Sequence, residues 1–322
     1  MRLVPGLALA GILQADLHLD TPTQMVRQGV GLDGAGLESG LTQMRAGGTN
    51  LAVEVLWPPR EGDWAGHVDR LFTKVEEEDA RLEAVRVVRS PREARAVADS
   101  GGIGLVIALE GAHGIDASGI PGLDRLTARG LSMLGLTWSF SNRFAGSSGD
   151  GGGGLTLAGE ELVAEANRLG VLVDVSHASV ATTRDACRLT RAPIVASHSD
   201  AASVHPHARN LTDAEITCIA RSGGVIGLNV HASFVGRPAS VARIADHAEH
   251  LRAVGGLGVV ALGSDFDGLI TPPPDLTDAS MIPKLWDELR RRGWTESDLV
   301  LVRGENFLRA WAATRSIAGL AP

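Results

Sequence analysis

Short apolar runs alternate with longer amphipathic segments along most of this chain. The runs have the length of buried β-strands and are bounded by glycine or polar residues, and many of the segments between them repeat at the spacing of an α-helix. We predict eight strands, at residues 11–18, 50–57, 102–110, 131–138, 170–177, 192–198, 223–230 and 258–265. Helical patterns lie between most of them, at residues 67–88, 158–170, 181–189, 213–223 and 241–256. Eight such units predict a single (β/α)8 (TIM) barrel over residues 1–322.

Polar side chains stand at the carboxyl ends of these predicted strands. A (β/α)8 barrel places its active site at that end. In chain order the end positions are His18 and Asp20, Glu110, Trp138, His177, His198, Asn229 with His231, and Asp265. Five of the eight strands therefore end in a residue that can bind a metal ion. Polar residues placed at random would rarely coincide with so many strand ends. We interpret these ends as one site.

The first strand carries Asp16, His18 and Asp20 at every second position. Strand side chains alternate between faces, so all three should point the same way, and buried carboxylates there would need a partner such as a cation. Simpler interpretations remain open, because a lone His-X-Asp occurs by chance and Glu110 would also suit the start of a helix. Other histidines stand in helix or loop contexts and are interpreted as surface residues: His67, His205, His207, His247 and His250.

Three histidines, two aspartates and one glutamate make a set of nitrogen and oxygen ligands that suits zinc, with manganese or cobalt as alternatives. Six candidate ligands exceed the needs of one tetrahedral zinc, so we expect two zinc ions about 3.5–4 Å apart. Glu110, alone at its strand end, is the expected bridge. Metals so placed lower the pKa of water to about 7, which predicts hydrolysis at a carbonyl or phosphoryl centre. We assign Asp265 the role of general base and then acid.

Composition narrows the range of partners. The chain has 322 residues, a net charge of −8 and an isoelectric point of about 5.7. Phosphate binding requires a basic surface, so we predict no nucleic-acid partner. No apolar run approaches the ~20 residues of a membrane-spanning helix, so we predict no membrane partner either. Tyrosine is absent, which excludes a tyrosine nucleophile or acid.

Two features bear on the cellular compartment. Cys187 and Cys218 are too few for a disulfide framework and fit a reducing compartment. The first fifteen residues resemble a short signal peptide, with one arginine followed by an apolar stretch. Cleavage after Ala15 would, however, remove most of the predicted first strand and leave His18 and Asp20 next to an unanchored N-terminus. We therefore predict that this segment is retained as the first strand and that the protein is cytoplasmic.

Long segments of the chain resemble the membrane dipeptidase (renal dipeptidase) family of zinc peptidases. The resemblance runs from "DLHLDT" to "RGENFLR" and is densest in "GLTLAGEELVAEANRLGVLVDVSHAS", "PIVASHSDAASVHPHARNLTD" and "ALGSDFDG". It implies a (β/α)8 barrel and, position by position, zinc ligands of which the glutamate bridges both ions: His18, Asp20, Glu110, His177 and His198. It also implies that Asp265 carries a proton, that Arg209 binds the substrate's carboxylate, and that the protein is a homodimer. Asp16 would support the site from behind the ligands.

The resemblance departs from the mammalian pattern at one position. That pattern ends its fourth strand in Leu-Thr-His, whose histidine helps to hold the tetrahedral intermediate, whereas this chain has Trp138 there. The segment "GLTWSFSNRFAG" looks like a bacterial variant, in which Asn142 would lie near the substrate. An indole donates one hydrogen bond and cannot carry charge. Losing one donor to an oxyanion typically costs about 10²–10³ in turnover, so the departure bears on substrate and rate.

We therefore expect a binuclear zinc dipeptidase, whose substrates in this family include dipeptides with a C-terminal D-residue. An alternative keeps the metal barrel and changes the substrate to another amide, a lactam, a lactone or a phosphoester. In that case Trp138 and residues 230–234 would line an altered pocket. A third hypothesis is a metal-binding scaffold that no longer catalyses, and the complete set of ligands together with Asp265 argues against it.

Overall fold

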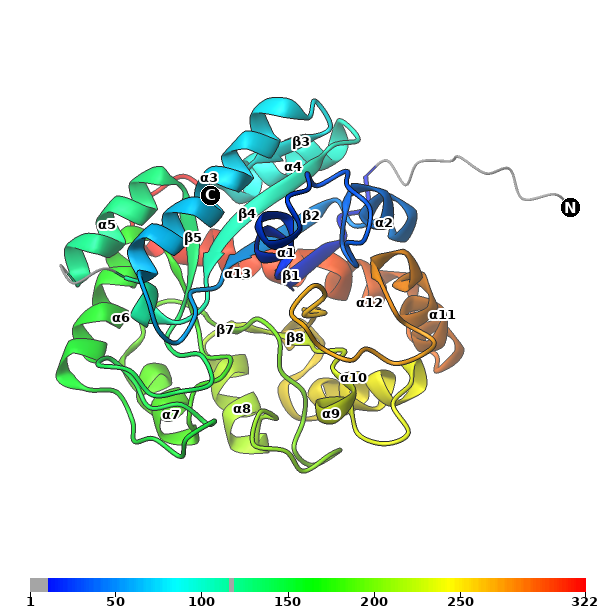
Figure 1. The fold of residues 1–322 in the computed structure, drawn as a ribbon. Helices are drawn as coiled ribbons and strands as arrows, with labels where there is room; N and C mark the ends of the chain where they lie inside the picture. Colours follow the sequence, from blue (N-terminus) through cyan, green and yellow to red (C-terminus); the bar gives the residue numbers. More distant parts are fainter. Residues whose placement is uncertain (1–10, 116–118) are drawn as a thin grey trace, which may run out of the picture.

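The computed structural model describes residues 11–115 and 119–322, and its strands form one parallel sheet that curves into a barrel (Figure 1). Hydrogen bonds join the strands in the order β1-β2-β4-β5-β6-β7-β8-β9, and β3 pairs with β4. The strands are β1 (Ala15–Leu19), β2 (Leu51–Leu56), β3 (Val85–Val87), β4 (Ile103–Leu109), β5 (Leu131–Gly135), β6 (Leu172–Asp174), β7 (Ile194–Ala196), β8 (Val225–Leu228) and β9 (Val260–Leu262). All eight predicted strands are present, and the predicted (β/α)8 fold is confirmed.

Helices surround the sheet on its outer side (Figure 1). They are α1 (Thr21–Gln28), α2 (Leu41–Gly47), α3 (Trp64–Arg81), α4 (Pro91–Asp99), α5 (Ile120–Arg129), α6 (Leu157–Leu169), α7 (Val180–Leu189), α8 (Asp213–Arg221), α9 (Ala232–Val235), α10 (Val241–Gly255), α11 (Pro283–Arg291), α12 (Glu296–Val300) and α13 (Asn306–Ile317). Short helical turns are η1 (Ala112–Gly114), η2 (Leu257–Val259), η3 (Ala279–Met281) and the π-helical η4 (Leu301–Glu305). Local sequence fixes several ends: Thr212 and Glu215 form a capping box at α8, and Gly170 ends α6 in the left-handed conformation.

The strand β3 corrects the helical prediction for residues 67–88. Helix α3 ends at Arg81, and Val85 then pairs with Ile103 of β4. In this short strand Val85 is buried while Arg86 is exposed, which is the alternation of a strand with one solvent-facing side. Three residues are too few for that alternation to stand out beside a long helical pattern.

The barrel closes where its first strand meets its last. Asp265 N–H donates to the His18 carbonyl at 3.0 Å, and Asp20 N–H donates to the Phe266 carbonyl at 3.0 Å. The backbone of Leu19 forms a parallel bridge with Phe266. These contacts join the last residues of β1 and the residue after it to the residues that follow β9, so the closing contact is made by the residues that begin the candidate site.

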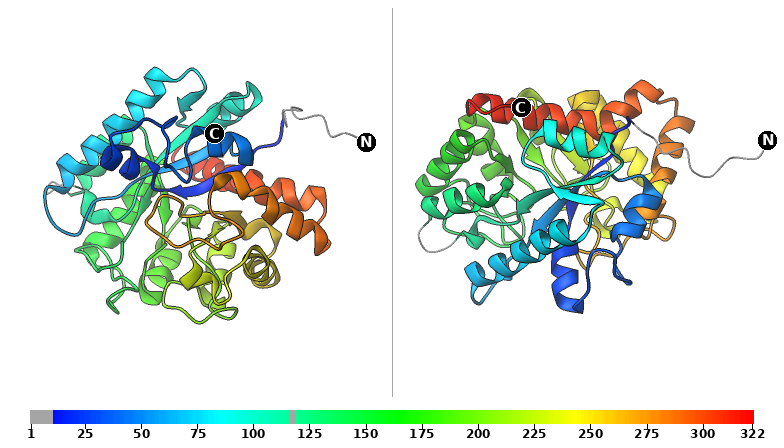
Figure 2. Two further views of the ribbon diagram at one scale, coloured as in Figure 1. Left: turned by 45° about the vertical axis from the view of Figure 1, so that its right-hand side comes forward. Right: turned by 90° about the horizontal axis from the view of Figure 1, so that it is seen from above.

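The opposite end of the barrel is covered by α13. This helix passes behind the strands in Figure 1 and lies along the edge of the barrel in the right-hand view of Figure 2. Its Phe307 and Trp311 are fully buried in one core cluster with Leu13 and Leu51 at the strand starts. The end that carries the polar residues is therefore the accessible one.

The prediction that His247 lies at the surface is wrong. This residue on α10 is completely buried. Its Nδ1 accepts a hydrogen bond from the Ala201 backbone N–H at 3.1 Å, and its Nε2 lies 3.0 Å from the Val235 carbonyl oxygen. A ring that accepts at Nδ1 and donates at Nε2 is neutral. Burial lowers the pKa of His247 to about 4.

We expect His247 to make folding stability depend on pH. In the unfolded chain a histidine binds its proton near pH 6.5, whereas folded His247 resists protonation down to about pH 4. The unfolded state therefore binds more protons in this window, and the free energy of unfolding falls as the pH drops from 6.5 to 4, by at most about 3 kcal/mol from this group. Urea unfolding across this range should show a shallower dependence in His247→Gln. An unchanged slope would remove His247 as the cause.

The two cysteines form a disulfide. Cys187 on α7 and Cys218 on α8 have Cα atoms 6.2 Å apart, a separation that suits such a bond. The cysteine count alone predicts thiols of a reducing compartment, and the structure corrects this. The pairing follows from the packing of α7 beside α8, which no local pattern around either cysteine reveals.

In the described ranges no helix combines the length and apolar character needed to cross a membrane. The N-terminal segment that resembles a signal peptide lies largely outside the described residues, which begin at residue 11. Of its described part, residues 11–14 precede β1, so only Ala15 of this segment belongs to the strand predicted over residues 11–18, which the structure places at Ala15–Leu19.

Candidate metal and catalytic site

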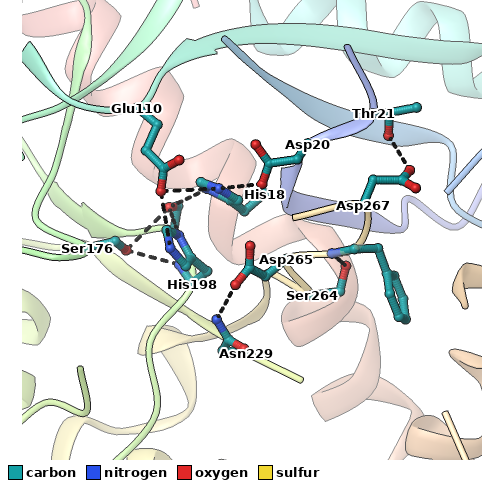
Figure 3. A network of polar contacts seen from close by, with 12 residues as sticks. His18, Asp20, Thr21, Glu110, Ser176, His198, Asn229, Ser264, Asp265 and Asp267 are labelled. Atoms are coloured by element: carbon teal, nitrogen blue, oxygen red, sulfur yellow. Dashed lines mark hydrogen bonds and ion pairs between the residues drawn. The ribbon is translucent and has the colours of Figure 1, made fainter. Parts of the chain in front are cut away.

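The carboxyl ends of five barrel strands bring six metal-binding or acidic side chains together, and Figure 3 labels all of them except His177. They are His18 and Asp20 at β1, Glu110 after β4, His177 after β6, His198 after β7 and Asp265 after β9. All six are buried. The five side chains predicted to bind metal and the predicted proton-carrying aspartate thus lie at one end of the barrel.

Two groups of potential ligand atoms contain only predicted site residues, and a third group, made by His18, Asp174 and His198, overlaps both. In the first group, atoms of His18, Asp20 and Asp265 lie within 4.8 Å of one another. In the second, atoms of Glu110, His177 and His198 do so. The first group comes from the two strands that close the barrel, and the second comes from the middle of the sheet.

Glu110 lies between the two groups. Its Oε1 is 3.0 Å from His177 Nε2 and 3.5 Å from His198 Nε2, and it is 3.6 Å from His18 Nε2. One carboxylate oxygen therefore faces histidines of both groups, which is the position expected of a ligand shared by two metal ions.

The charges of the site call for a cation. Burial raises the pKa of Glu110 well above its usual value, and the nearby Asp20 carboxylate adds to this. Burial lowers the pKa values of His177 and His198 well below the usual value, so both rings are neutral and have a lone pair to give. Among the described residues, the buried His18 Nε2 has no hydrogen-bond partner. An unpartnered ring nitrogen beside converging carboxylates fits divalent metal ions such as zinc.

Asp265 is held in an unusual backbone conformation at the edge of the first group. Its φ is +69°, a left-handed value that non-glycine residues adopt mainly where the surrounding structure imposes it. Asn229 Nδ2 donates to Asp265 Oδ2 at 3.1 Å (Figure 3), which leaves Oδ1 for other partners. Burial raises the pKa of Asp265 to about 7, against the lowering effect of His18. A Cβ on Gly268 would lie 2.5 Å from Oδ1, so this glycine keeps that oxygen accessible.

Asp267 fixes the loop that carries Asp265, and the sequence prediction missed it. Its Oδ2 accepts hydrogen bonds from Ser39 Oγ at 2.6 Å and Thr21 Oγ1 at 3.1 Å, and its Oδ1 accepts from the Glu38 backbone N–H at 2.8 Å. These contacts tie the end of β9 to α1 and to the loop before α2. The only local sign of this residue is the second aspartate in "SDFDG". Its role could not be predicted from that segment, because its hydrogen-bond partners lie far away in the sequence.

Asp16 lies behind the ligands, as expected of a supporting residue. Its Oδ1 accepts from Ser264 N–H at 2.8 Å and from His18 N–H at 3.3 Å. Burial raises the pKa of Asp16 to about 6. The carboxylate thus spans the closing strands, and it orients the backbone on which His18 stands.

Arg209 is buried close to both groups. Its Nη2 donates to the His198 carbonyl at 3.2 Å, and its guanidinium carbon is 5.4 Å from the centre of the Phe234 ring. Burial lowers the pKa of Arg209 from its usual value, while Asp265 and Glu110 oppose this effect. Among the described residues its buried Nε has no hydrogen-bond partner, and Arg209 is not part of the described lining of the cavity at this end of the barrel.

A cavity of about 310 Å³ opens above the site. Asp20, Glu110, His177 and Asp265 contribute to its floor, and aromatic and apolar side chains form much of its wall: Trp57, Trp138, Phe234, Leu269 and Ile270. The Trp138 ring is half-buried with its centre 5.1 Å from that of Trp57 and 6.3 Å from that of His177. Trp138 thus lines the cavity beside a candidate ligand, and Trp57 joins it there. A volume of this size accommodates a small molecule rather than a long chain.

The structure gives Asn142 a different place from the one the sequence suggested. The described lining of the cavity does not include it. Its Nδ2 donates to the Leu136 carbonyl at 2.8 Å, and its Oδ1 accepts from the N–H groups of Phe144 and Ala145. The amide is used to shape the loop after β5, as asparagine side chains often do in turns.

Comparison with known proteins gives the same picture. The model of the membrane dipeptidase family (peptidase family M19) matches residues 9–321. The dipeptidase aclJ of Aspergillus oryzae is 37% identical over 225 residues, which cover 68% of this chain and 53% of that protein, so the chain spans about half the length of this curated relative.

Two solved structures are similar over nearly their whole length. The dipeptidase AC, a metallopeptidase of family M19, shares 28% identity with a TM-score of 0.88, covering 94% of this chain and 99% of that one. A metallopeptidase from Rhodobacter sphaeroides, liganded with a phosphinate mimic of the dipeptide L-Ala-D-Ala, shares 27% identity with a TM-score of 0.86 and the same coverage.

Proposed function

Because the chain belongs to the membrane dipeptidase family, peptidase family M19, we propose that it is a binuclear zinc dipeptidase. Its substrates would include dipeptides with a C-terminal D-residue, since the liganded relative holds a mimic of L-Ala-D-Ala. The observation that carries the proposal is the position of Glu110 Oε1 within 3.6 Å of histidines from both groups. One group would then hold one zinc with His18 and Asp20, and the other would hold the second with His177 and His198.

The remaining residues have roles that follow from their geometry. Zinc ions at such a site supply a Lewis acid for the scissile carbonyl and a water of lowered pKa. Asp265 Oδ1 would take up a proton and deliver it to the departing amine, while Asn229 holds Oδ2. The wall of Trp57 and Trp138 limits the space for the rest of the dipeptide.

Arg209 would pair with the C-terminal carboxylate of the dipeptide. We expect Arg209→Met to lower kcat/KM for free dipeptides about 10- to 100-fold, because a hydrogen bond to a charged group contributes about 1.5–3 kcal/mol. Dipeptide amides lack that carboxylate, so their slow turnover should be the same in both proteins. Steady-state kinetics on the paired substrates provide the measurement. An equal loss on both would place Arg209 in a general structural role.

A substrate panel tests the proposed function. Zinc-loaded protein is given L-Ala-L-Ala and L-Ala-D-Ala, the N-acetylated and C-amidated forms of each, a lactone and a phosphodiester. Cleavage of the free dipeptides with loss of activity in the blocked forms supports a dipeptidase, and the ratio of the two stereoisomers gives its preference. Preference for an N-acylated substrate, a lactone or a phosphodiester would instead favour the alternative of another amidohydrolase-like reaction. The observation that favours this alternative is the half-buried Trp138 in the cavity wall, which would alter the shape of the substrate pocket.

A further inference from the structure

One serine hydroxyl contacts both groups of candidate ligands from behind. Ser197 Oγ is 2.8 Å from His198 Nδ1 and 3.1 Å from His18 Nδ1. The same oxygen is 2.6 Å from Asp174 Oδ2. Ser197 is completely buried, and the ring centres of the two histidines are only 3.7 Å apart.

The direction of each hydrogen bond follows from the number of protons available. Asp174 Oδ1 already accepts from the backbone N–H groups of Ser176 and Ser197, both at 2.9 Å, so this carboxylate is held as an acceptor. A hydroxyl has one proton to donate and two lone pairs with which to accept. Ser197 donates its proton to Asp174, and its two lone pairs accept the Nδ1–H groups of His18 and His198.

Both rings are then fixed in the same tautomer. With the proton on Nδ1, the lone pair is on Nε2, and those two nitrogens lie 3.6 Å and 3.5 Å from Glu110 Oε1. The hydrogen bond on the far nitrogen of a metal-binding histidine orients the ring and selects its tautomer. Here a single hydroxyl does this for one histidine of each group.

The backbone leaves Ser197 little freedom to move. A Cβ on Gly227 would lie 1.9 Å from the Ser197 carbonyl oxygen, and a Cβ on Gly263 would lie 1.7 Å from it. Only glycine at these two positions, one within β8 and the other directly after β9, permits this approach, so the hydroxyl is presented from a fixed position.

We propose that Ser197, oriented by Asp174, is a positioning residue shared by both zinc positions, so that its loss weakens the binding of both ions together. The proposal rests on the proposed function, because it concerns the same site. It goes beyond the ligand set in naming one group through which the two positions are coupled.

Ser197→Ala tests the proposal, with Ser176→Ala as the matched control. Ser176 is also buried, and its hydroxyl accepts from His198 N–H at 3.1 Å and lies 3.3 Å from Ser197 Oγ, but no contact joins it to either ring among the described residues. Zinc affinities are measured by competition with a chelator, after circular dichroism has established that each variant is folded. We expect both ions to bind about 10- to 100-fold more weakly in Ser197→Ala. We expect affinities near those of the unaltered protein in Ser176→Ala.

A second readout needs neither metal nor activity. Nitrogen-15 NMR of metal-free protein should show the Nδ1–H tautomer for His198, and mixed tautomers in Ser197→Ala. Asp174→Asn, which gives the hydroxyl a donor in place of an acceptor, should disturb the same ring. A protein that takes up no zinc would overturn the proposed function, and the tautomers would still decide the role of the hydroxyl.

Three results of the zinc-affinity measurements would overturn the shared role. They are unchanged affinities in Ser197→Ala, a loss confined to one ion, or an equal loss in Ser176→Ala. Unaltered tautomers in a folded Ser197→Ala variant would do so as well.

Discussion

Glu110→Gln is expected to remove the bound metal from at least one position and to lower kcat/KM for dipeptides by at least about 10³-fold. The substitution keeps the size of the side chain but removes the charge that faces histidines of both groups. A metal ion contributes several kcal/mol to the stabilisation of the reacting carbonyl, and about 4 kcal/mol corresponds to that factor. Zinc content by elemental analysis and steady-state kinetics measure the two effects.

Glu54→Gln is a suitable control for this variant. Glu54 is also a buried glutamate, on β2, the strand next to β4, and it belongs to neither ligand group. Burial raises the pKa of Glu54, and the charges of Asp267, Asp16 and Asp20 add to this, so Glu54 is neutral. We expect two zinc ions per chain in this control. Two tightly bound ions and normal turnover in Glu110→Gln would show that the bridging role is wrong.

Asp265→Asn is expected to lower kcat by about 10²–10⁴-fold, the usual contribution of a general acid or base, while the protein keeps two zinc ions. The amide cannot take up and release a proton, but its oxygen can still accept the hydrogen bond from Asn229. KM should change little, since substrate binding is assigned to other residues. The measurement is kcat, KM and zinc content on one preparation.

The zinc content of Asp265→Asn also separates two roles. Asp265 lies within 4.8 Å of potential ligand atoms of His18 and Asp20, which is close enough for a ligand. Loss of one ion together with activity would assign Asp265 to metal binding rather than to proton transfer.

The fold and the polar strand ends could be predicted because both depend on local signals. An apolar run followed by a histidine or carboxylate is visible within eight residues, and the (β/α)8 topology places such ends together. The observed contacts of Glu110 with three histidines follow from that rule alone.

The features that the sequence did not reveal all depend on distant partners. His247 is buried because Ala201 and Val235 supply a donor and an acceptor for its ring. Cys187 meets Cys218 only after two helices pack. Ser197 directly precedes His198 in the sequence, but its hydroxyl contacts His18 only because the folded barrel brings these distant residues together.

The closing contact of the barrel has a consequence for how the protein acquires its metals during synthesis. His18 and Asp20 leave the ribosome early, whereas Asp265 comes from the last strand, and the backbone bonds between them form only when the sheet closes. The second group, from β4, β6 and β7, is complete before β9 has been made. The residues of the second group are therefore all synthesised before the first group is complete, and under the proposed function an ion bound by the first group would link the two ends of the sheet.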